Sequence, residues 1–191
     1  VPPVDHRVER GLGLAVGTVA AEHAAVRRTG QHHVQTRGDV TLGADVAAGG
    51  GLVTVTAGGT LTMADGVTVS SLSGAATDAR RVVLQAAGDL TLSIVQADES
   101  LAITSTGGAL LDGLSGDAAN LRSDTARLAA ATGIGQAGAA LHTALDTVGA
   151  SNGGGSGGIH LAEADALSLV SGGLVSEGGT IDVAWRVVND G

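Results

Sequence analysis

A five-residue unit recurs along this chain at nearly constant spacing, and no other feature constrains the fold as strongly. The unit is glycine, any residue, an aliphatic residue, any residue and a second aliphatic residue. Its six copies, one of them weak, begin at Gly38, Gly59, Gly88, Gly108, Gly157 and Gly179. Successive first glycines are 21, 29, 20, 49 and 22 positions apart. The interval of 29 positions indicates one unit with an insertion near residues 71–80. The interval of 49 positions indicates two units with an insertion near residues 151–158. The alternation within each copy predicts a β-strand with one buried face.

Short strands with a period of about 20 residues predict an all-β fold, a right-handed parallel β-helix (β-solenoid) built from stacked coils. Each strand pairs with its counterpart about 4.8 Å away in the next coil, and the inward aliphatic residues form continuous columns. Further strands are predicted at residues 52–57, 82–86, 101–105 and 167–171. The predicted inward residues are Val40, Leu42, Leu61, Met63, Val82, Leu84, Leu90, Leu92, Leu101, Ile103, Ile159, Leu161, Ile181 and Val183.

The composition suits a narrow core of this kind. Glycine supplies 32 of the 191 residues, while Phe, Tyr and Cys are absent. Ordinary globular cores use aromatic side chains to fill volume, whereas Val, Leu and Ala fit narrow, regular layers. A chain without cysteine forms neither a disulfide scaffold nor a zinc–cysteine site. No apolar run approaches eighteen residues, so we expect no membrane-spanning helix.

The charge argues against one class of partner. Ten basic and 19 acidic residues give a formal net charge of −9, which disfavours binding to nucleic acid phosphates. The lack of cysteine is compatible with export to an oxidising compartment. The sequence starts Val1-Pro2-Pro3-Val4, without Met and without the apolar core of a signal peptide. We therefore expect a piece of a longer protein or a processed product.

Two regions fit the repeat poorly. Residues 1–37 hold five of the ten arginines and four of the six histidines, and we interpret them as a degenerate coil or an N-terminal cap. Residues 38–191 are expected to form the solenoid. Within that part, residues 137–148 carry Leu141, Leu145 and Val148 at helical spacing. They form either a short helix docked on the rod or an irregular coil, and we favour the coil.

Several stretches of the chain resemble the coils of filamentous-haemagglutinin-like proteins. They are GDVTLGADVAAGG (38–50), AGGTLTMADGVTV (57–69), AAGDLTLSIVQADESLAITSTGGALLD (86–112), RLAAATGIGQAGAALHTALDTVGAS (127–151) and GGIHLAEADALSL (157–169). The resemblance covers roughly residues 38–188 and is specific for the type of coil. It implies a rod or stalk segment of a large secreted or cell-surface bacterial adhesin, exported by a two-partner or autotransporter route. Residues 1–37 depart from the pattern.

Two glycine-rich segments match binding motifs. Gly133, Gly135 and Gly138 form a G-x-G-x-x-G sequence, as in dinucleotide folds, but no buried strand is predicted before it and no suitable acidic residue follows. We interpret it as a turn. Residues 154–159 nearly match the calcium-binding nonapeptide, yet Ile159 occupies the position of the required Asp. Asp112, Asp117 and Asp124 lack the ligand spacing of a calcium loop.

Carboxylate pairs raise the alternative of a carbohydrate-active β-helix enzyme or a carbohydrate-binding module. Glu163 and Asp165 are predicted about 7 Å apart on one side of a strand, whereas Asp98 and Glu99 are adjacent and point apart. The only Trp lies 20 residues or more from Glu163 and Asp165, so a solvated strand face is the preferred interpretation. The His32-His33 pair in a polar stretch indicates a loop more than a metal site.

An ice-binding solenoid is a further alternative, because threonine ladders on a flat β-helix face can order water. The position between the two aliphatic residues of the unit reads Thr41, Thr62 and Thr91, and then Leu111, His160 and Asp182. The last three residues interrupt any regular lattice.

The sequence thus favours a structural rod with no catalytic residues and no cofactor or metal. Host or surface glycans or proteins are candidate ligands of such a rod. The expected association site is the last coil, where Ile181 and Val183 form a strand with Trp185, the only large aromatic residue. Trp185 either anchors a neighbouring coil or copy end to end, or plugs the lumen.

Overall fold

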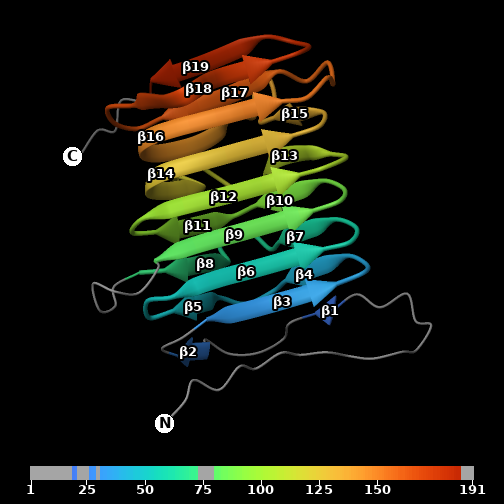
Figure 1. Ribbon diagram of the computed structural model, residues 1–191, viewed down its shortest axis with the longest axis vertical. Helices are drawn as coiled ribbons and strands as arrows, with labels where there is room; N and C mark the ends of the chain where they lie inside the picture. The colour runs from blue at the N-terminus through green and yellow to red at the C-terminus, as the bar shows by residue number, and fades with distance from the viewer. Residues whose placement is uncertain (1–18, 21–25, 29–30, 73–79, 186–191) are drawn as a thin grey trace.

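The computed structural model describes residues 19–20, 26–28, 31–72 and 80–185 as a right-handed parallel β-solenoid of about seven turns. Every strand pairing in it is parallel, and no helix occurs in these residues. In Figure 1 the strands of the front face run to the right while the chain climbs from the N-terminal end, which gives the right-handed sense. The fold predicted from the repeat is therefore confirmed.

Each coil contributes strands to three faces (Figure 1). Face 1 contains β3 (His32–Thr36), β6 (Leu52–Ala57), β9 (Arg81–Ala86), β12 (Ser100–Ser105), the later parts of β14 (Leu121–Ala130) and β16 (Leu141–Asn152), and β18 (Ser168–Ser176). Face 2 contains β1 (Val19–Ala20), β4 (Val40–Leu42), β7 (Leu61–Met63), β10 (Leu90–Leu92), β13 (Ala109–Asp112), β15 (Gly133–Ile134), β17 (Ile159–Glu163) and β19 (Ile181–Trp185). Face 3 contains β2 (Val26–Arg28), β5 (Val46–Ala48), β8 (Thr68–Ser71), β11 (Ile94–Ala97) and the first parts of β14 and β16. The later parts of β17 and β19 continue from face 2 onto face 3, where they stack on the first part of β16.

The length of each coil follows from the register of face 1. One column of paired residues runs through His32, Val53, Val82, Leu101, Ala126, Val148 and Leu169, so successive steps are 21, 29, 19, 25, 22 and 21 residues. The step of 29 places its extra residues between β8 and β9. The 49-residue interval of the glycine repeat holds one further coil, whose face 2 strand, β15, has only two residues.

The core is a set of aliphatic columns inside the three faces. Twelve of the fourteen residues predicted to point inward are buried. Ile181 and Val183 lie in the same columns, but Ile181 is exposed and Val183 is only partly buried. Both belong to β19, which pairs with β17 on one side and with no described strand on the other. These two residues therefore lie in the predicted inward columns, and they stay exposed or partly buried because no described coil covers them.

Glycine recurs where faces 1 and 2 meet because the coils touch there. A Cβ atom added to Gly58 would lie 2.4 Å from the carbonyl oxygen of Arg37 in the preceding coil. The neighbouring aspartates join the coils as well. Asp39 Oδ1 accepts a 2.7 Å hydrogen bond from the Thr60 N–H, and Asp89 Oδ1 accepts one of 2.9 Å from the Ala109 N–H. The Gly-Asp pairs of the repeat are thus contacts between coils.

The segment of ambiguous pattern, residues 137–148, contains no helix. Its larger part is the first part of β16, in which Leu141, Thr143 and Leu145 are buried and alternate with partly exposed residues. The chain then passes a corner at Asp146 and continues on face 1. The interpretation as a coil is confirmed. The predicted insertion near residues 71–80 falls largely on residues 73–79, which lie outside the described residues, as do most residues of segment 1–37.

Candidate functional site

The C-terminal end of the rod carries most of the large apolar side chains that are exposed in the described residues. Five large apolar side chains are exposed in the described part of the chain, and four of them belong to β18 and β19. Their exposed fractions are 56% for Leu169, 48% for Val175, 45% for Ile181 and 63% for Trp185. The fifth, Leu72, lies at a corner in the middle of the rod. An apolar patch gathered at one end is the surface most suited to association.

Three of these four side chains continue core columns of the rod. They are exposed because no described coil lies beyond them. Leu169 pairs with buried Val148, and Ile181 pairs with buried Ile159. Trp185 pairs with Glu163, so it stands over a column that runs through Val69, Val95 and Leu121. Val175 differs, because its partner Ser151 is itself exposed and points outward. The geometry places Trp185 on the open end of the rod, and its exposure argues against the interpretation as a plug inside the lumen.

Glu163 lies in the same column as Trp185, one coil below it, and is completely buried. Its Oε2 accepts a 2.8 Å hydrogen bond from the Thr143 hydroxyl. Its Oε1 accepts hydrogen bonds from the backbone N–H groups of Leu145, Ala164 and Asp165, at 3.2, 3.0 and 3.4 Å. The carboxylate therefore ties the turn after β17 to the preceding coil.

Burial raises the pKa of Glu163 above its ordinary value, because the charged form loses solvation, and a contact with the Asp165 side chain acts in the same direction. Hydrogen bonds from Thr143, Ala164 and Leu145 oppose this effect. The prediction of a solvated Glu163–Asp165 pair is wrong for Glu163, since only Asp165 is exposed. The strand ends at Glu163, so the two carboxylates do not share a strand face.

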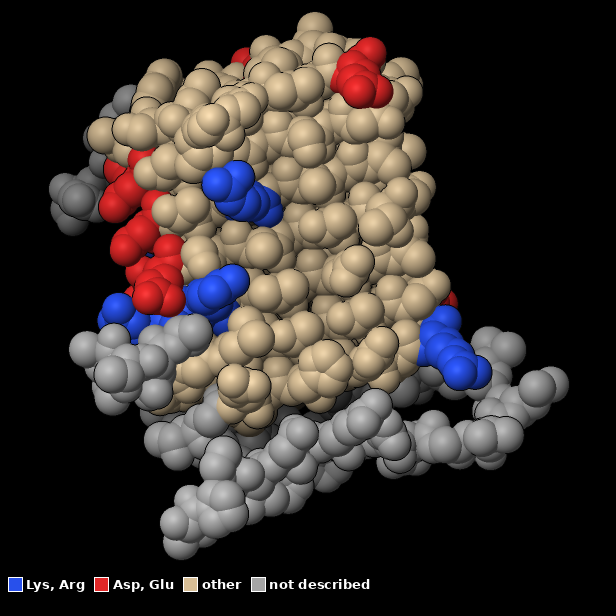
Figure 2. All heavy atoms as spheres, viewed as in Figure 1, with Lys and Arg blue, Asp and Glu red and all other residues tan. Residues whose placement is uncertain are grey.

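A second group of carboxylates follows the corner between faces 3 and 1. Glu99, Asp124 and Asp146 directly precede Ser100, Thr125 and Thr147, which pair in register, so the three acids stack along one corner. Figure 2 shows acidic side chains along the left edge of the rod. Faces 3 and 1 meet at this corner, so the three carboxylates lie on an outward edge of the rod.

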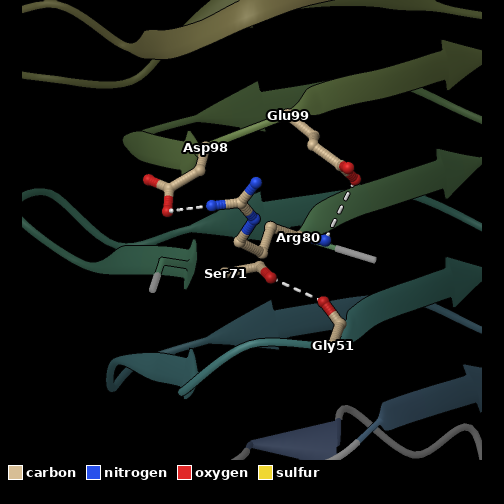
Figure 3. Close-up of polar contacts among 5 residues, drawn as sticks. All are labelled: Gly51, Ser71, Arg80, Asp98 and Glu99. Atoms are coloured by element: carbon tan, nitrogen blue, oxygen red, sulfur yellow. Dashed lines mark hydrogen bonds and ion pairs between the residues drawn. The ribbon is translucent and has the colours of Figure 1, made fainter. Parts of the chain in front are cut away.

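Arg80 lies at the same corner, directly after residues 73–79. Its guanidinium lies 3.5 Å from an Asp98 carboxylate oxygen, and its backbone N–H donates to Glu99 Oε2 at 3.2 Å (Figure 3). On the other side of the segment, the Ser71 hydroxyl donates to the Gly51 carbonyl oxygen. These contacts fix the two ends of the inserted segment to neighbouring coils.

Face 1 is broad and poor in charge. Among the face 1 strands, only β9 and the later part of β14 contain a charged residue, Arg81 and Arg127 respectively. The other outward positions are mainly Thr, Ser, Ala, Gly, Val and Gln. Figure 2 views this face and shows few charged side chains across its centre.

The glycine-rich motif at Gly133 forms a turn. Gly135 and Gly138 have φ values of 63° and 82°, and Gln136 pairs with Ala139 in an isolated antiparallel bridge that closes the turn. Strand β16 follows instead of a helix, so these residues do not supply the helix N-terminus on which a pyrophosphate would bind.

The other candidate ligands are spread over different parts of the fold. No group of three or more His, Asp or Glu side chains in the described residues is placed to hold a metal ion. Asp112 accepts hydrogen bonds from the Leu114 N–H and the Asn120 amide, while Asp117 and Asp124 are exposed. His32 occupies an inward column, and His33 is exposed on the opposite side of β3. The pair therefore does not converge on one site.

The threonine ladder spans three coils. Thr41, Thr62 and Thr91 pair in register on face 2, and Leu111 continues their row. His160 is buried and pairs with Asp182, which is exposed. His160 alternates with the inward Ile159 and Leu161, so it lies on the outward side of β17 as predicted, although it is buried there.

Sequence reasoning missed two buried asparagines at corners. The Asn120 amide donates to the carbonyl oxygens of Leu92 and Ser93 and to Asp112, and its Oδ1 accepts from the His142 N–H. The Asn152 amide donates to the carbonyl oxygens of Gly155 and Gly178. Asn120 directly precedes β14 and Asn152 is the last residue of β16, and each lies next to a turn rich in Gly and small residues, which is the signal that could have identified them.

The fold places this chain in the class of parallel β-solenoids. Comparison with known proteins identifies no family within that class. No protein-family model, curated protein or solved structure matches this chain. Within the described residues, no helix has the length and apolar character required to cross a bilayer.

Proposed function

We propose that this chain is a rod segment of a large secreted or cell-surface bacterial protein of the adhesin type, with a structural and not a catalytic role. One observation carries the proposal: the inward columns, which are mainly aliphatic, continue from coil to coil and end in exposed apolar side chains at the C-terminal end. A set of coils of this kind works as a spacer, because each coil contacts only its neighbours and the length is set by their number.

The distribution of polar groups supports the proposal. Corner residues such as Asp39, Asp89 and Asn120 bind the backbone of adjacent coils, so their polar groups serve the stacking. The stacked acids at Glu99, Asp124 and Asp146 lie along a projecting corner, whereas catalytic carboxylate pairs flank a bound sugar. The extracellular, bacterial part of the proposal is supported by the resemblance of the repeats to filamentous-haemagglutinin-like coils.

Labelling of intact cells tests the location and the role. Antibodies against the purified chain are expected to stain intact cells of the organism that encodes it, and external protease is expected to remove the signal. Staining that requires permeabilised cells would overturn the proposal.

Deletion of one complete coil tests the spacer role in the full-length protein. Removal of residues 126–147 joins Thr125 to Val148 and keeps the columns in register, because Thr125 pairs with Thr147 and Ala126 with Val148. We expect this variant to fold and to reach the cell surface. The matched control removes only residues 126–136, which breaks the register and is expected to abolish folding. Loss of surface display or folding in both variants alike would contradict the spacer role.

A further inference from the structure

One asparagine of this chain is followed by glycine, and it lies at the end of a buried strand. The chain contains three asparagines, Asn120, Asn152 and Asn189, and only Asn152 precedes a glycine. Asn152 is the last residue of β16 and is 1% exposed. An Asn-Gly step is especially prone to spontaneous deamidation, because glycine has no side chain to keep its backbone nitrogen away from the asparagine Cγ. The contacts of Asn152 and Gly153 in the fold decide whether this reaction occurs.

The reaction needs a free backbone nitrogen and access for water. The Gly153 nitrogen attacks Cγ of Asn152, so that a C–N bond forms, the bond from Cγ to Nδ2 breaks, and ammonia leaves. Water, or hydroxide at alkaline pH, carries the proton from the Gly153 nitrogen to the leaving amide. Water then opens the resulting succinimide ring to aspartate, or to isoaspartate, in which the main chain passes through Cβ and Cγ. Solvent therefore supplies every co-reactant.

The preceding coil blocks the attacking nitrogen. The Gly153 N–H donates a 2.9 Å hydrogen bond to the Ala130 carbonyl oxygen, so its proton is engaged in the ladder between coils. Burial of Asn152 keeps water away from the Cγ atom next to it. Both requirements of the reaction are thus unmet in the folded rod.

The following coil closes the site from the other side. The Asn152 amide nitrogen donates to the Gly178 carbonyl oxygen at 3.1 Å and to the Ser176 hydroxyl oxygen at 3.3 Å, both in the coil that carries β18 (Figure 1). A third hydrogen bond, of 3.2 Å, reaches the Gly155 carbonyl oxygen. Three acceptors therefore hold the leaving group of the reaction. The site opens when the coil of β18 separates from β16, which is a local unfolding event.

The product of the reaction does not fit the place of the asparagine. All three partners of the amide nitrogen act as acceptors, because the Ser176 hydroxyl gives its own hydrogen to the Gly178 carbonyl oxygen at 2.6 Å. The Oδ1 atom of Asn152 is buried and has no hydrogen-bond partner among the described residues. An aspartate here would bring a charge into a buried site that offers no donor for it. Isoaspartate adds a carbon atom to the main chain and moves the Gly153 N–H away from Ala130.

We infer that Asn152–Gly153 is a site of spontaneous deamidation that the stacking of the following coil closes, and that deamidation in an open or unfolded chain prevents this coil from stacking again. A folded rod keeps its asparagine, whereas a chain that stays unfolded acquires a carboxylate that its own fold excludes. The inference concerns the chemistry of the chain and does not depend on where the rod is located.

Mass spectrometry of the complete chain after incubation at alkaline pH tests the closure of the site. One sample is kept folded and a second is unfolded in guanidinium chloride, and the peptide that contains residue 152 is followed over time in both. Asn152 is expected to deamidate at least tenfold faster in the unfolded sample, because the folded chain reacts only from its open fraction. Asn120, which precedes Leu121, is the internal control and is expected to react at least tenfold more slowly than Asn152 in denaturant.

Gly153→Ala is the matched variant for the reactivity of the unfolded chain. A Cβ atom added to Gly153 has a single neighbour within 4 Å, the Ala130 carbonyl oxygen at 3.8 Å, and the φ of Gly153 lies outside the left-handed region. The variant is therefore expected to fold like the wild type. In denaturant, its Asn152 is expected to deamidate at least tenfold more slowly than that of the wild type, because the added methyl group hinders the attack.

Urea unfolding of Asn152→Asp tests the effect of the product, because this variant carries the aspartate from the start. At neutral pH its equilibrium constant for unfolding is expected to exceed that of the wild type at least tenfold. The matched control, Ser151→Asp, adds the same charge at the neighbouring exposed position and is expected to change little. In acid, the protonated side chain of the Asn152→Asp variant can donate to the Gly178 carbonyl oxygen, so the difference between the two variants is expected to shrink. A variant that folds in acid and not at neutral pH gives the same answer.

Three results would overturn the inference. They are equal rates of deamidation at Asn152 in the folded and unfolded samples, an unfolded Gly153→Ala variant that reacts as fast as the wild type, and an Asn152→Asp variant as stable as Ser151→Asp at neutral pH. A loss of stability in Asn152→Asp that is equally large in acid would also overturn it, since that result assigns the loss to packing instead of charge. None of these results bears on the surface labelling of cells, which tests the proposed function separately.

Discussion

The Thr143 hydroxyl donates a 2.8 Å hydrogen bond to the carboxylate of Glu163, its in-register neighbour on the next coil, and both side chains are completely buried. The two residues replace the aliphatic pairs of the same column closer to the N-terminus, such as Val95 and Leu121. A buried carboxylate is stable only when hydrogen bonds compensate the lost solvation. Glu163 meets this condition through three backbone N–H groups and one hydroxyl.

Replacement of Glu163 by Gln is expected to preserve or increase stability at neutral pH. The amide oxygen can accept the three backbone hydrogen bonds that now reach Oε1, and the amide nitrogen can donate to the Thr143 hydroxyl, without a buried charge. Glu163→Leu removes the acceptor of the buried Leu145 N–H and of the buried Thr143 hydroxyl, and it is expected to cost on the order of 3 kcal/mol. Urea unfolding of the three proteins at pH 7 measures the difference. Equal losses in both variants would contradict this role of the carboxylate.

The pH dependence of stability is expected to differ between the wild type and Glu163→Gln. Burial raises the folded-state pKa of Glu163 above its ordinary value of 4.5, so the folded protein binds a proton more tightly than the unfolded chain. Stability from this group is therefore fully present below pH 4.5 and is lost as the pH rises through the raised pKa. Thermal unfolding at half-unit pH steps measures it. Glu163→Gln is expected not to lose stability over this pH range. If the unfolding temperature of the wild type changes with pH in parallel with that of Glu163→Gln, the pH effect does not come from Glu163.

The aliphatic columns are expected to tolerate no charge that lacks hydrogen-bond partners. Leu90 is fully buried between Leu61 and Leu110, so Leu90→Asp places an unpaired carboxylate in the core at a cost of about 4 kcal/mol or more. The matched control is Thr62→Asp, an exposed position on the same face one coil below. Far-UV circular dichroism and urea unfolding distinguish the two variants. A folded Leu90→Asp variant with the stability of the control would contradict the column packing.

The predictable part of this fold is local. Alternation within Gly38–Leu42 and its copies defines which side chains point inward, because a strand has a period of two residues wherever it occurs. The same rule identifies Glu163, which has the parity of Ile159 and Leu161 in β17. The expectation that the Glu163 carboxylate is solvated was based on its residue type. Its inward position in β17 explains why it is buried instead.

Local sequence patterns do not define where the chain turns a corner between two faces. Strand β16 turns a corner at Asp146, so its inward residues change parity there. Leu141, Leu145 and Val148 consequently fall at helical spacing although every segment is a strand. The exposure of Ile181 and Trp185 depends equally on what lies beyond the last described coil, and no local pattern contains that information. The alternation predicts a strand at β19, where the association site is expected, but it does not define how far the residues of this strand are buried.

The loop after β13 is expected to depend on Asp65. Asp65 Oδ1 accepts a 3.0 Å hydrogen bond from the Ser115 N–H, and the second carboxylate oxygen accepts the Ser115 hydroxyl. Asp65→Ala is expected to increase exchange of the Ser115 amide proton at least tenfold, as measured by NMR protection factors. Asp65→Asn keeps an acceptor for the N–H and is expected to change the protection little. Unchanged protection in Asp65→Ala would show that other contacts hold the loop.

Acid is expected to release the same loop in the wild type. The hydrogen bonds from the Ser115 side chain and backbone lower the pKa of Asp65 below its ordinary value of 3.8. Stabilisation by this group is therefore present above pH 3.8 and is lost as the pH falls through the lowered folded-state pKa. The Ser115 protection factor is expected to fall in that range in the wild type and to stay constant in Asp65→Asn. A parallel decrease in both proteins would assign the acid effect to other groups.

The turn that resembles a dinucleotide motif is expected to depend on Gly135 more than on Gly138. Gly135 has a φ of 63°, and a Cβ atom added there would lie 2.3 Å from the carbonyl oxygen of His160 and 2.9 Å from the backbone nitrogen of Leu141. Gly135→Ala combines the left-handed backbone with a contact to rigid main-chain atoms, and its expected cost is about 2–4 kcal/mol. Gly138 has a φ of 82° but open space around its Cα, so Gly138→Ala is expected to cost about 1 kcal/mol. Calorimetry measures both changes. If the glycines serve coil stacking, NAD does not raise the unfolding temperature of the wild type. Equal costs in the two variants, or stabilisation by NAD, would contradict the interpretation as a stacking turn.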